Sequence, residues 1–313
     1  MSYRIGHIGA GVMGGGMARR ALATGNQVSV CDLRAEIRED FARLGARVVN
    51  SAAGLGALCD VVVLSLPRAE DVEAACFGPD GLVASLRPGT VVIDASSTPP
   101  EGMERLNEAV RARGARVVDA PLCPSQNREL RHRPNPPGSE HLNAGGRAAC
   151  AGNLCFFVGG APEDVAAARP VLDLLGIQSH HVGPLGAGKL VKLLHNAINI
   201  TALAAISETM VVAERSGLDV AVVVDALITS LADSAMLRNQ GRDYIAARKF
   251  PKGLYPLPFS EKDVAYALRA AHQVGLTPTV IGATHALYAR ACASPWRDYY
   301  NPAIFRFIKG DQP

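Results

Sequence analysis

The sequence predicts an α/β fold in which a doubly wound parallel sheet over residues 1–184 precedes a mostly helical domain over residues 185–313. In the first part, short apolar runs alternate with segments of helical periodicity, which is typical of parallel strands joined by crossover helices. After residue 184 the strand-like runs stop and helical periodicity alone continues. A long helix over residues 186–216 is expected to join the two domains.

Glycines, prolines and changes of periodicity set the bounds of the expected elements. The expected strands are residues 4–8, 28–31, 47–49, 61–66, 91–94, 117–119 and 154–158. The expected helices are residues 13–23, 35–44, 71–76, 101–113 and 162–175 in the first domain, and 220–231, 263–274 and 279–292 in the second. Residues 123–147 contain four prolines and predict a long inserted loop, whereas residues 250–259 contain three and predict a connecting loop.

The overall composition narrows the class of protein. Hydrophobic residues make up 48% of the chain and charged residues 19%, as in a globular protein with a sizeable core. A net charge of +3 argues against a nucleic-acid partner, and polar residues within the apolar stretch 197–213 favour a buried helix over a membrane span. Seven cysteines without a C-x-x-C pair predict neither a disulfide framework nor a metal site, and they favour a cytoplasmic protein.

The strongest motif follows the first expected strand. Residues 9–14 read G-x-G-x-x-G, with a strand before them and a helix after them. In this context Gly9 permits a tight turn, Gly11 lets a pyrophosphate approach the backbone, and Gly14 lets the helix lie close to the strand. The free N–H groups at the helix start would bind the phosphates, so the sequence predicts a Rossmann domain that binds a dinucleotide.

An acidic residue completes this signature. Asp32 closes the second expected strand, about 20 residues after the glycines, where a carboxylate accepts hydrogen bonds from the adenosine ribose. The same carboxylate repels a 2′-phosphate, which favours NAD. Arg34 lies close by and can accommodate that phosphate, so NADP stays open as well.

Four further segments strengthen the assignment. Residues 65–67 (S-L-P) follow the fourth expected strand and residues 94–100 (D-A-S-S-T-P-P) follow the fifth. Residues 186–196 read G-A-G-K-L-V-K-L-L-H-N, and residues 261–263 read E-K-D. Together with residues 9–18, these segments resemble the β-hydroxyacid dehydrogenase family, which includes 3-hydroxyisobutyrate dehydrogenases and tartronate semialdehyde reductases.

The resemblance implies an NAD(P)-dependent enzyme that interconverts a small 3-hydroxy acid and its semialdehyde or keto form. It implies an N-terminal domain like the NAD-binding domain of 6-phosphogluconate dehydrogenase, a carboxylate-bearing substrate, and a homodimer or homotetramer. Signature and resemblance together place the cofactor contacts at Gly9, Gly11, Val12, Met13, Gly14, Asp32, Leu33, Arg34, Leu66, Pro67, Ser96, Ser97 and Lys262.

The resemblance assigns proton transfer to Lys192 and places Asn196 beside it. Hydride transfer to a carbonyl leaves an alkoxide that needs a proton, and a lysine whose pKa is lowered toward neutrality can supply it. Asn196 lies four residues further on the same helix face, where its amide could hold the substrate hydroxyl or the lysine. Lys189 borders that face too, so geometry alone leaves both lysines open and only the motif spacing selects Lys192.

The substrate loop departs from the family pattern, in which S-G-G follows the D-A-P triplet. Here residues 119–121 are followed by leucine and then by Cys123, Pro124 and Ser125, and a proline has no N–H to offer to a carboxylate. These three residues could line the site. Alternatively the motif resumes after the insert, at Gly145 and Gly146, which is the placement that the paired glycines favour.

Two residues of the catalytic motifs keep alternative interpretations. His195 is either a substrate contact or a hydrogen-bonded core histidine. Asp263 is expected to cap the helix that it begins. Two other functions compete with the dehydrogenase: an NADPH-dependent imine reductase, and a non-catalytic cofactor-binding scaffold. Imine reductases generally carry aspartate or tyrosine in place of Lys192, and the scaffolds lose the lysine, so its presence argues against both.

Overall fold

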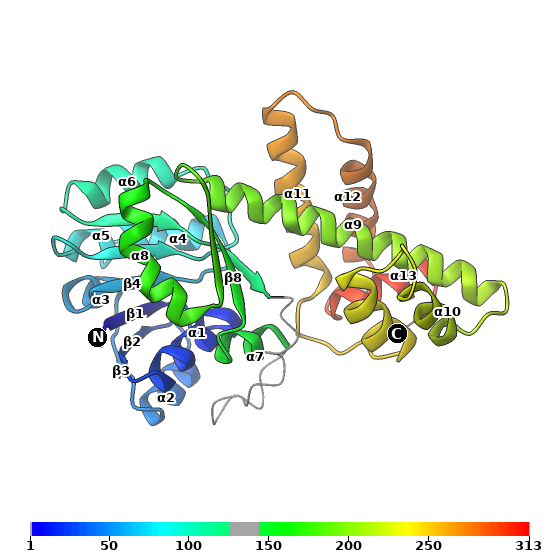
Figure 1. Cartoon of the computed structure of the whole chain (residues 1–313), viewed down its shortest axis with the longest axis horizontal. Helices are drawn as coiled ribbons and strands as arrows, with labels where there is room; N and C mark the ends of the chain where they lie inside the picture. Colours follow the sequence, from blue (N-terminus) through cyan, green and yellow to red (C-terminus); the bar gives the residue numbers. More distant parts are fainter. Residues whose placement is uncertain (1, 126–143, 313) are drawn as a thin grey trace. The chain divides into compact units, whose positions relative to one another are not determined.

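The computed structural model describes residues 2–125 and 144–312 (Figure 1). The chain forms two compact units, Met1–Lys192 and Leu193–Pro313.

The first unit is built on one mixed sheet. Its strand order is β3-β2-β1-β4-β5-β6-β8-β7, and β9 pairs with β8. From β3 to β6 all neighbours are parallel, and the order 3-2-1-4-5-6 is that of the Rossmann fold, which confirms the predicted fold class. The strands are β1 (Arg4–Ile8), β2 (Gln27–Cys31), β3 (Arg47–Val48), β4 (Val61–Leu64), β5 (Val91–Asp94), β6 (Arg116–Asp119), β7 (Leu122–Pro124), β8 (Leu154–Gly159) and β9 (Gln178–Gly183).

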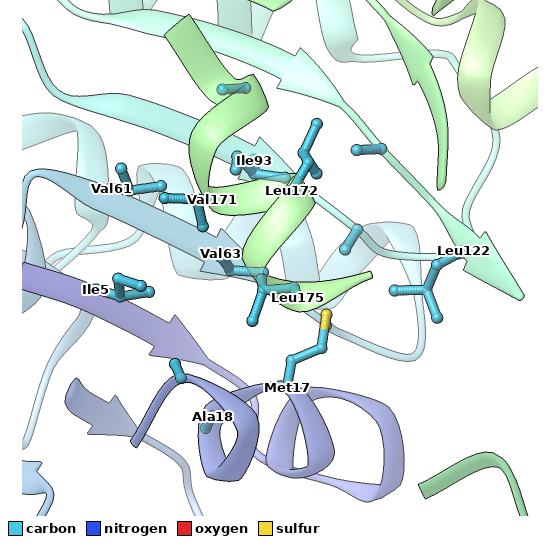
Figure 2. Close-up of a cluster of buried hydrophobic side chains, with 14 of the residues drawn as sticks. Ile5, Met17, Ala18, Val61, Val63, Ile93, Leu122, Val171, Leu172 and Leu175 are labelled. Carbon is cyan, nitrogen blue, oxygen red and sulfur yellow. The ribbon is translucent and has the colours of Figure 1, made fainter. Parts of the chain in front are cut away.

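Helices cover both faces of this sheet, because successive side chains of each central strand point to opposite faces and both sets are apolar. Val61 and Val63 of β4 join a core under α1 and α8, which Figure 2 shows with Met17 and Leu172 among its members. Val62 joins the second core, under α3, α5 and α6. The helices are α1 (Val12–Ala23), α2 (Ala35–Arg43), α3 (Ala52–Leu58), α4 (Ala69–Phe77), α5 (Leu82–Ser85), α6 (Met103–Arg111), α7 (Ala144–Cys150) and α8 (Pro162–Leu175).

The structure corrects the predicted insert. Residues 123–147 do not form one continuous loop, because β7 occupies its start and α7 its end. The rest of that predicted loop, residues 126–143, lies outside the described residues. Proline-rich flanking sequence concealed β7, whose three residues become a strand only by pairing with β8. Strand formation here therefore depends on a partner that is distant in sequence, which local periodicity does not reveal.

The second unit is helical, as predicted. Its first element is the greater part of α9 (Ala187–Arg215), which ends before Gly217, a residue with a φ of 79°. A buried cluster that includes Leu203, Tyr288 and Phe305 forms its core. The other elements are α10 (Val220–Leu227), the π-helix η2 (Leu237–Ala246), α11 (Leu257–Gln273), α12 (Thr279–Cys292), the 3₁₀ turn η3 (Asn301–Ala303) and α13 (Ile304–Lys309). By length and composition alone α9 could also cross a membrane, a criterion that buried core helices satisfy too.

Two predictions for α11 were wrong. The helix begins at Leu257 rather than Asp263, within the stretch predicted as a loop, and Pro258 lies in its first turn. Proline is tolerated there because the first N–H groups of a helix have no partner within the helix. Asp263 therefore does not cap the helix but lies buried inside it, more than one turn beyond the start.

His7 gives the first unit a predictable sensitivity to acid. This residue of β1 is fully buried, neither ring nitrogen has a hydrogen-bond partner among the described residues, and burial lowers its pKa to about 3. The unfolded chain binds the proton near pH 6.5, so stability is complete above that pH and falls as the pH drops toward 3. The expected slope is about 1.4 kcal/mol per pH unit.

We predict that His7→Leu removes this contribution, so that its free energy of unfolding, measured by urea titration, falls less than that of the wild type between pH 6.5 and pH 4.5. The difference should reach about 2 kcal/mol. His180→Leu, at an exposed position, should keep the wild-type dependence. Equal acid sensitivity of His7→Leu and the wild type would contradict the prediction.

Candidate active site

The glycine turn between β1 and α1 has the geometry of a phosphate cradle. Gly9 has a φ of 81°, and a Cβ there would lie 2.6 Å from the carbonyl oxygen of Ser65. A Cβ on Gly14 would collide with the carbonyl oxygen of Gly9. A Cβ on Gly11 would meet only the guanidinium of Arg34, at 3.6 Å. Gly9 and Gly14 are therefore required by packing, whereas Gly11 leaves open space where a pyrophosphate can approach.

The surroundings of this turn fit a dinucleotide. The first turn of α1 carries no acidic residue, so its N–H groups and positive dipole end face an anion without competition. Leu33 is 97% exposed and Val12 is exposed as well, which leaves apolar surface for a nucleoside to cover. On the neighbouring strand ends, the N–H of Leu66 donates to Ser96 Oγ at 3.1 Å and so joins the loops that follow β4 and β5. Met13 lies in the first turn of α1, Pro67 in the loop after β4, and Ser97 in the loop after β5.

Asp32 lies at the end of β2 and is tied into this turn. It accepts hydrogen bonds from the N–H of Ala10 at 2.8 Å and from Nε and Nη2 of Arg34, each at 2.9 Å. Burial acts to raise the pKa of Asp32, but these hydrogen bonds outweigh it and the pKa lies below its ordinary value. The carboxylate is therefore ionised at neutral pH, and it holds Arg34 in a bidentate pair.

The start of α9 is docked on the carboxyl edge of the sheet. Asp119, the last residue of β6, accepts hydrogen bonds from the N–H of Gly186 at 2.6 Å and of Lys189 at 2.7 Å. A Cβ on Gly188 would collide with this carboxylate and with the carbonyl oxygen of Phe157. Burial raises the pKa of Asp119, and the two N–H groups oppose that shift. These bonds explain why the first turn of α9 belongs to the first unit, which ends at Lys192 rather than at the predicted residue 184.

The two lysines of this turn have different surroundings. Lys189 is 1% exposed, and its Nζ lies 2.9 Å from Asp94 Oδ2, 2.6 Å from Thr98 Oγ1 and 3.3 Å from the carbonyl oxygen of Ser96. Lys192 is 8% exposed, and its charge acts on the thiol of Cys155 in β8. The ammonium of Lys189 is thus buried and held by the end of β5 and by the loop that follows it.

The β7–β8 pair brings two cysteines together. Cys123 lies directly opposite Cys155 in the antiparallel register. The hydrogen bond between the two thiols, followed by burial, raises the pKa of Cys155, whereas the charge of Lys192 acts in the opposite direction. Pro124 is the exposed end of β7, and Ser125 is buried after it. Cys123 is therefore the cross-strand neighbour of the cysteine on which the charge of Lys192 acts.

Gly145 and Gly146, the favoured alternative for the substrate loop, lie elsewhere in the first unit. Both belong to α7, which lies against α1. A Cβ on Gly16 of α1 would lie 2.8 Å from the carbonyl oxygen of Gly146. Gly16 therefore permits the close approach of α1 to α7, and the paired glycines lie in the helix that packs against it.

The remaining predicted residues form a hydrogen-bonded group in the second unit. Asn196 Nδ2 donates to Asp263 Oδ2 at 2.8 Å, and the hydroxyl of Tyr255 donates to the same oxygen at 2.6 Å. Lys262 Nζ lies 3.3 Å from Asp263 Oδ1. His195 lies 3.0 Å from Asn196 Oδ1, and it is partly buried, so both interpretations of this histidine stay open. Sequence reasoning missed Tyr255 and expected only a capping role for Asp263. The E-K-D motif, which contains Asp263, was the available signal.

Burial raises the pKa of Tyr255 well above its ordinary value, and the charge of Asp263 raises it further. The phenol therefore stays protonated at neutral pH and donates its hydrogen bond to Asp263. With Asn196 donating to the same oxygen, the carboxylate of Asp263 has a fixed orientation at the centre of this group.

Comparison with known proteins decides the family. Residues 4–129 match the NAD-binding domain of 6-phosphogluconate dehydrogenase, and residues 186–308 match the NAD-binding domain of NADP-dependent 3-hydroxyisobutyrate dehydrogenase. A 3-hydroxyisobutyrate dehydrogenase of Pseudomonas aeruginosa is 32% identical over 71% of this chain and 68% of its own length. The chain belongs to the β-hydroxyacid dehydrogenase family. It is accordingly an NAD(P)-dependent dehydrogenase of that type, as the sequence predicted.

Other β-hydroxyacid dehydrogenases match over the whole chain. An L-threonate dehydrogenase of Cupriavidus necator is 28% identical over 99% of this chain and 97% of its own length. The structure of a Mycobacterium tuberculosis 3-hydroxyisobutyrate dehydrogenase with L-serine superposes with a TM-score of 0.83 at 25% identity, covering 99% of this chain and 100% of that one. Both units of the fold thus have counterparts in this family.

The open space at Gly11 leads to a prediction that separates cofactor binding from folding. In Gly11→Ala the added Cβ has room in the protein but occupies the approach of the pyrophosphate. The dissociation constant for the reduced cofactor, measured by its fluorescence, should rise at least about tenfold, or about 1.4 kcal/mol. The melting temperature should stay close to that of the wild type.

Gly282→Ala, at a helical glycine with nothing within 4 Å of the added Cβ, is the matched control and should bind as the wild type does. Wild-type affinity in Gly11→Ala would show that the cofactor does not approach this residue.

Proposed function

We propose that this enzyme oxidises a small carboxylate-bearing 3-hydroxy acid, or reduces the corresponding semialdehyde, with Lys192 as general acid and base. One observation carries the choice of lysine. Lys189 is bound to Asp94 inside the fold, whereas Lys192 lies one turn further along the docked helix, near the carboxyl edge of the sheet. Ligands of doubly wound sheets bind outside that edge.

The bound nicotinamide supplies or accepts the hydride, and the chain manages the proton. In the oxidation, Lys192 takes the proton of the substrate hydroxyl as hydride leaves the carbon; in the reduction, it protonates the developing alkoxide. Its burial to 8% exposure keeps competing water away from that transfer. Asn196 lies one turn further along α9, and its bond to Asp263 orients the amide that would hold the substrate hydroxyl.

The substrate class follows from the relatives and from β7. The related enzymes are named for L-threonate, 3-hydroxyisobutyrate and L-serine, all of which carry a carboxylate near a hydroxyl. Because Gly145 and Gly146 lie against α1, we assign the substrate contacts to Cys123 and Ser125 at the end of β7. Pro124 offers no N–H there, so a side-chain donor replaces part of a backbone anion grip.

We propose NAD as the preferred cofactor and the cytoplasm as the compartment. Asp32 is ionised and would repel a 2′-phosphate, and it already binds the guanidinium of Arg34, whose charge is thereby offset. Cysteines without a disulfide pattern favour a reducing compartment.

The decisive test is Lys192→Ala in an absorbance assay with NAD and NADP against L-threonate, 3-hydroxyisobutyrate and L-serine. We expect kcat to fall by about 10²–10⁴, the usual contribution of general acid–base catalysis, while the cofactor dissociation constant stays within about twofold of the wild type, since the lysine acts on the substrate.

Lys249→Ala, at an exposed lysine, should retain full activity. Turnover that survives in Lys192→Ala would reject the assigned role. Activity on cyclic imines with NADPH, and none on hydroxy acids, would instead identify an imine reductase.

We also propose that the enzyme is a homodimer or homotetramer. Ile198 of α9 is 70% exposed, and Leu194, one turn earlier, is exposed too, so the helix presents an apolar stripe to the outside. Ile198→Asp should lower the sedimentation coefficient, measured by analytical ultracentrifugation, toward that of a monomer because a charge would be buried in the interface. Leu231→Asp, at an equally exposed loop residue, should leave assembly unchanged. A monomeric wild type would end this proposal.

A further inference from the structure

We infer that Lys189 is a positioning residue of this enzyme, whose ammonium joins the cofactor-side loop after β5 to the helix that carries Lys192. The inference rests on the proposed role of Lys192. It assigns a positioning role to Lys189, the lysine of the motif to which no proton transfer is assigned.

The ammonium is held from three directions by one loop. Nζ lies within hydrogen-bond or ion-pair distance of Asp94, of the carbonyl oxygen of Ser96 and of the hydroxyl of Thr98, at 2.9, 3.3 and 2.6 Å. The loop is itself organised around the same carboxylate, because the N–H of Ser96 donates to Asp94 Oδ1 at 3.0 Å. Since Ser96 Oγ also accepts the N–H of Leu66, the network reaches the turn after β4.

The same residue is fixed at its backbone. Asp119 accepts the N–H of Lys189 while Asp94 binds its side chain, so β5 and β6 each hold one end of the residue. An α-helix is stiff over one turn, and Lys192 follows three residues later. Any displacement of Lys189 therefore displaces the amine of Lys192 relative to the loop on which the predicted cofactor contacts Ser96 and Ser97 lie.

Stability alone does not account for such a pair. Lys189 is 1% exposed and Asp94 is 0% exposed, and apolar side chains of similar volume usually serve a core as well as a buried ion pair does. The pair instead fixes the position of the side chain, because three acceptors define one location for the ammonium. A cavity of about 40 Å³, lined by Cys76, Met103 and others, lies beside it. An apolar side chain at residue 189 would therefore have space to adopt more than one position.

The test compares three single variants with the wild type: Lys189→Met, Thr98→Val and Thr98→Ser. Two quantities are measured per folded active site, well below each melting temperature: kcat on the preferred hydroxy acid, and the dissociation constant of the reduced cofactor by fluorescence. Misplacement by about 1 Å can cost about 10² in rate. We expect Lys189→Met to lower kcat at least about tenfold and to weaken cofactor binding at least about threefold, because helix and loop both lose their common anchor.

Thr98→Val removes one of the three acceptors, so it should shift both quantities in the same direction by less. Thr98→Ser keeps the hydroxyl and should restore wild-type values. The matched control is Lys249→Met, which removes an exposed lysine and should change neither quantity.

Wild-type kcat and cofactor affinity in Lys189→Met, whatever its melting temperature, would overturn the inference and leave the pair with a stabilising role only. If Lys189→Met does not fold, the two variants of Thr98 decide. Equal kcat and equal cofactor affinity in Thr98→Val and Thr98→Ser would overturn the inference. Failure of the proposed function has a different signature, in which Lys192→Ala keeps its turnover. The fluorescence measurement needs no turnover at all.

Discussion

The carboxylate of Asp119 is the constraint on which the first unit and the proposed chemistry depend. It terminates β6 and accepts two N–H groups from the start of α9, an approach that the absence of a side chain at Gly159 and Gly188 makes sterically feasible. A helix that begins on the carboxyl edge of the sheet brings its first turns to the edge where the dinucleotide signature lies. The same contact that ends the sheet domain therefore sets the position of Lys192, the proposed general acid and base.

Four buried carboxylates among the described residues are each satisfied in a different way. Asp94 has a lysine, Asp119 has backbone N–H groups, Asp32 has an arginine together with a backbone N–H, and Asp263 has a phenol and an amide. Burying a carboxylate without such partners would cost several kcal/mol. All four lie at an element end or beside a residue of the predicted site. The polar network that stabilises each unit is thus largely the network that orients its functional groups.

The replacement of S-G-G in the substrate loop changes how a carboxylate could be bound. Backbone N–H groups are rigid donors, whereas the cysteine pair on β7 and β8 offers polarisable thiols and Pro124 offers no donor. If the substrate carboxylate binds at this strand end, as proposed, its recognition depends on side chains.

The alternation of apolar strands and helices and the glycine signature could be predicted from sequence, because each depends on local geometry within a few residues. Lys192 and Asn196 were singled out by the resemblance of their motif to a known family, since local geometry alone left Lys189 open as well. The tertiary structure decided the role of Lys189, whose partners Asp94 and Thr98 lie far away in the sequence. It also decided the strand at Cys123, the helix start at Leu257 and the burial of Asp263. In each of these cases the deciding partner is non-local, so periodicity and local propensity carried no signal for it.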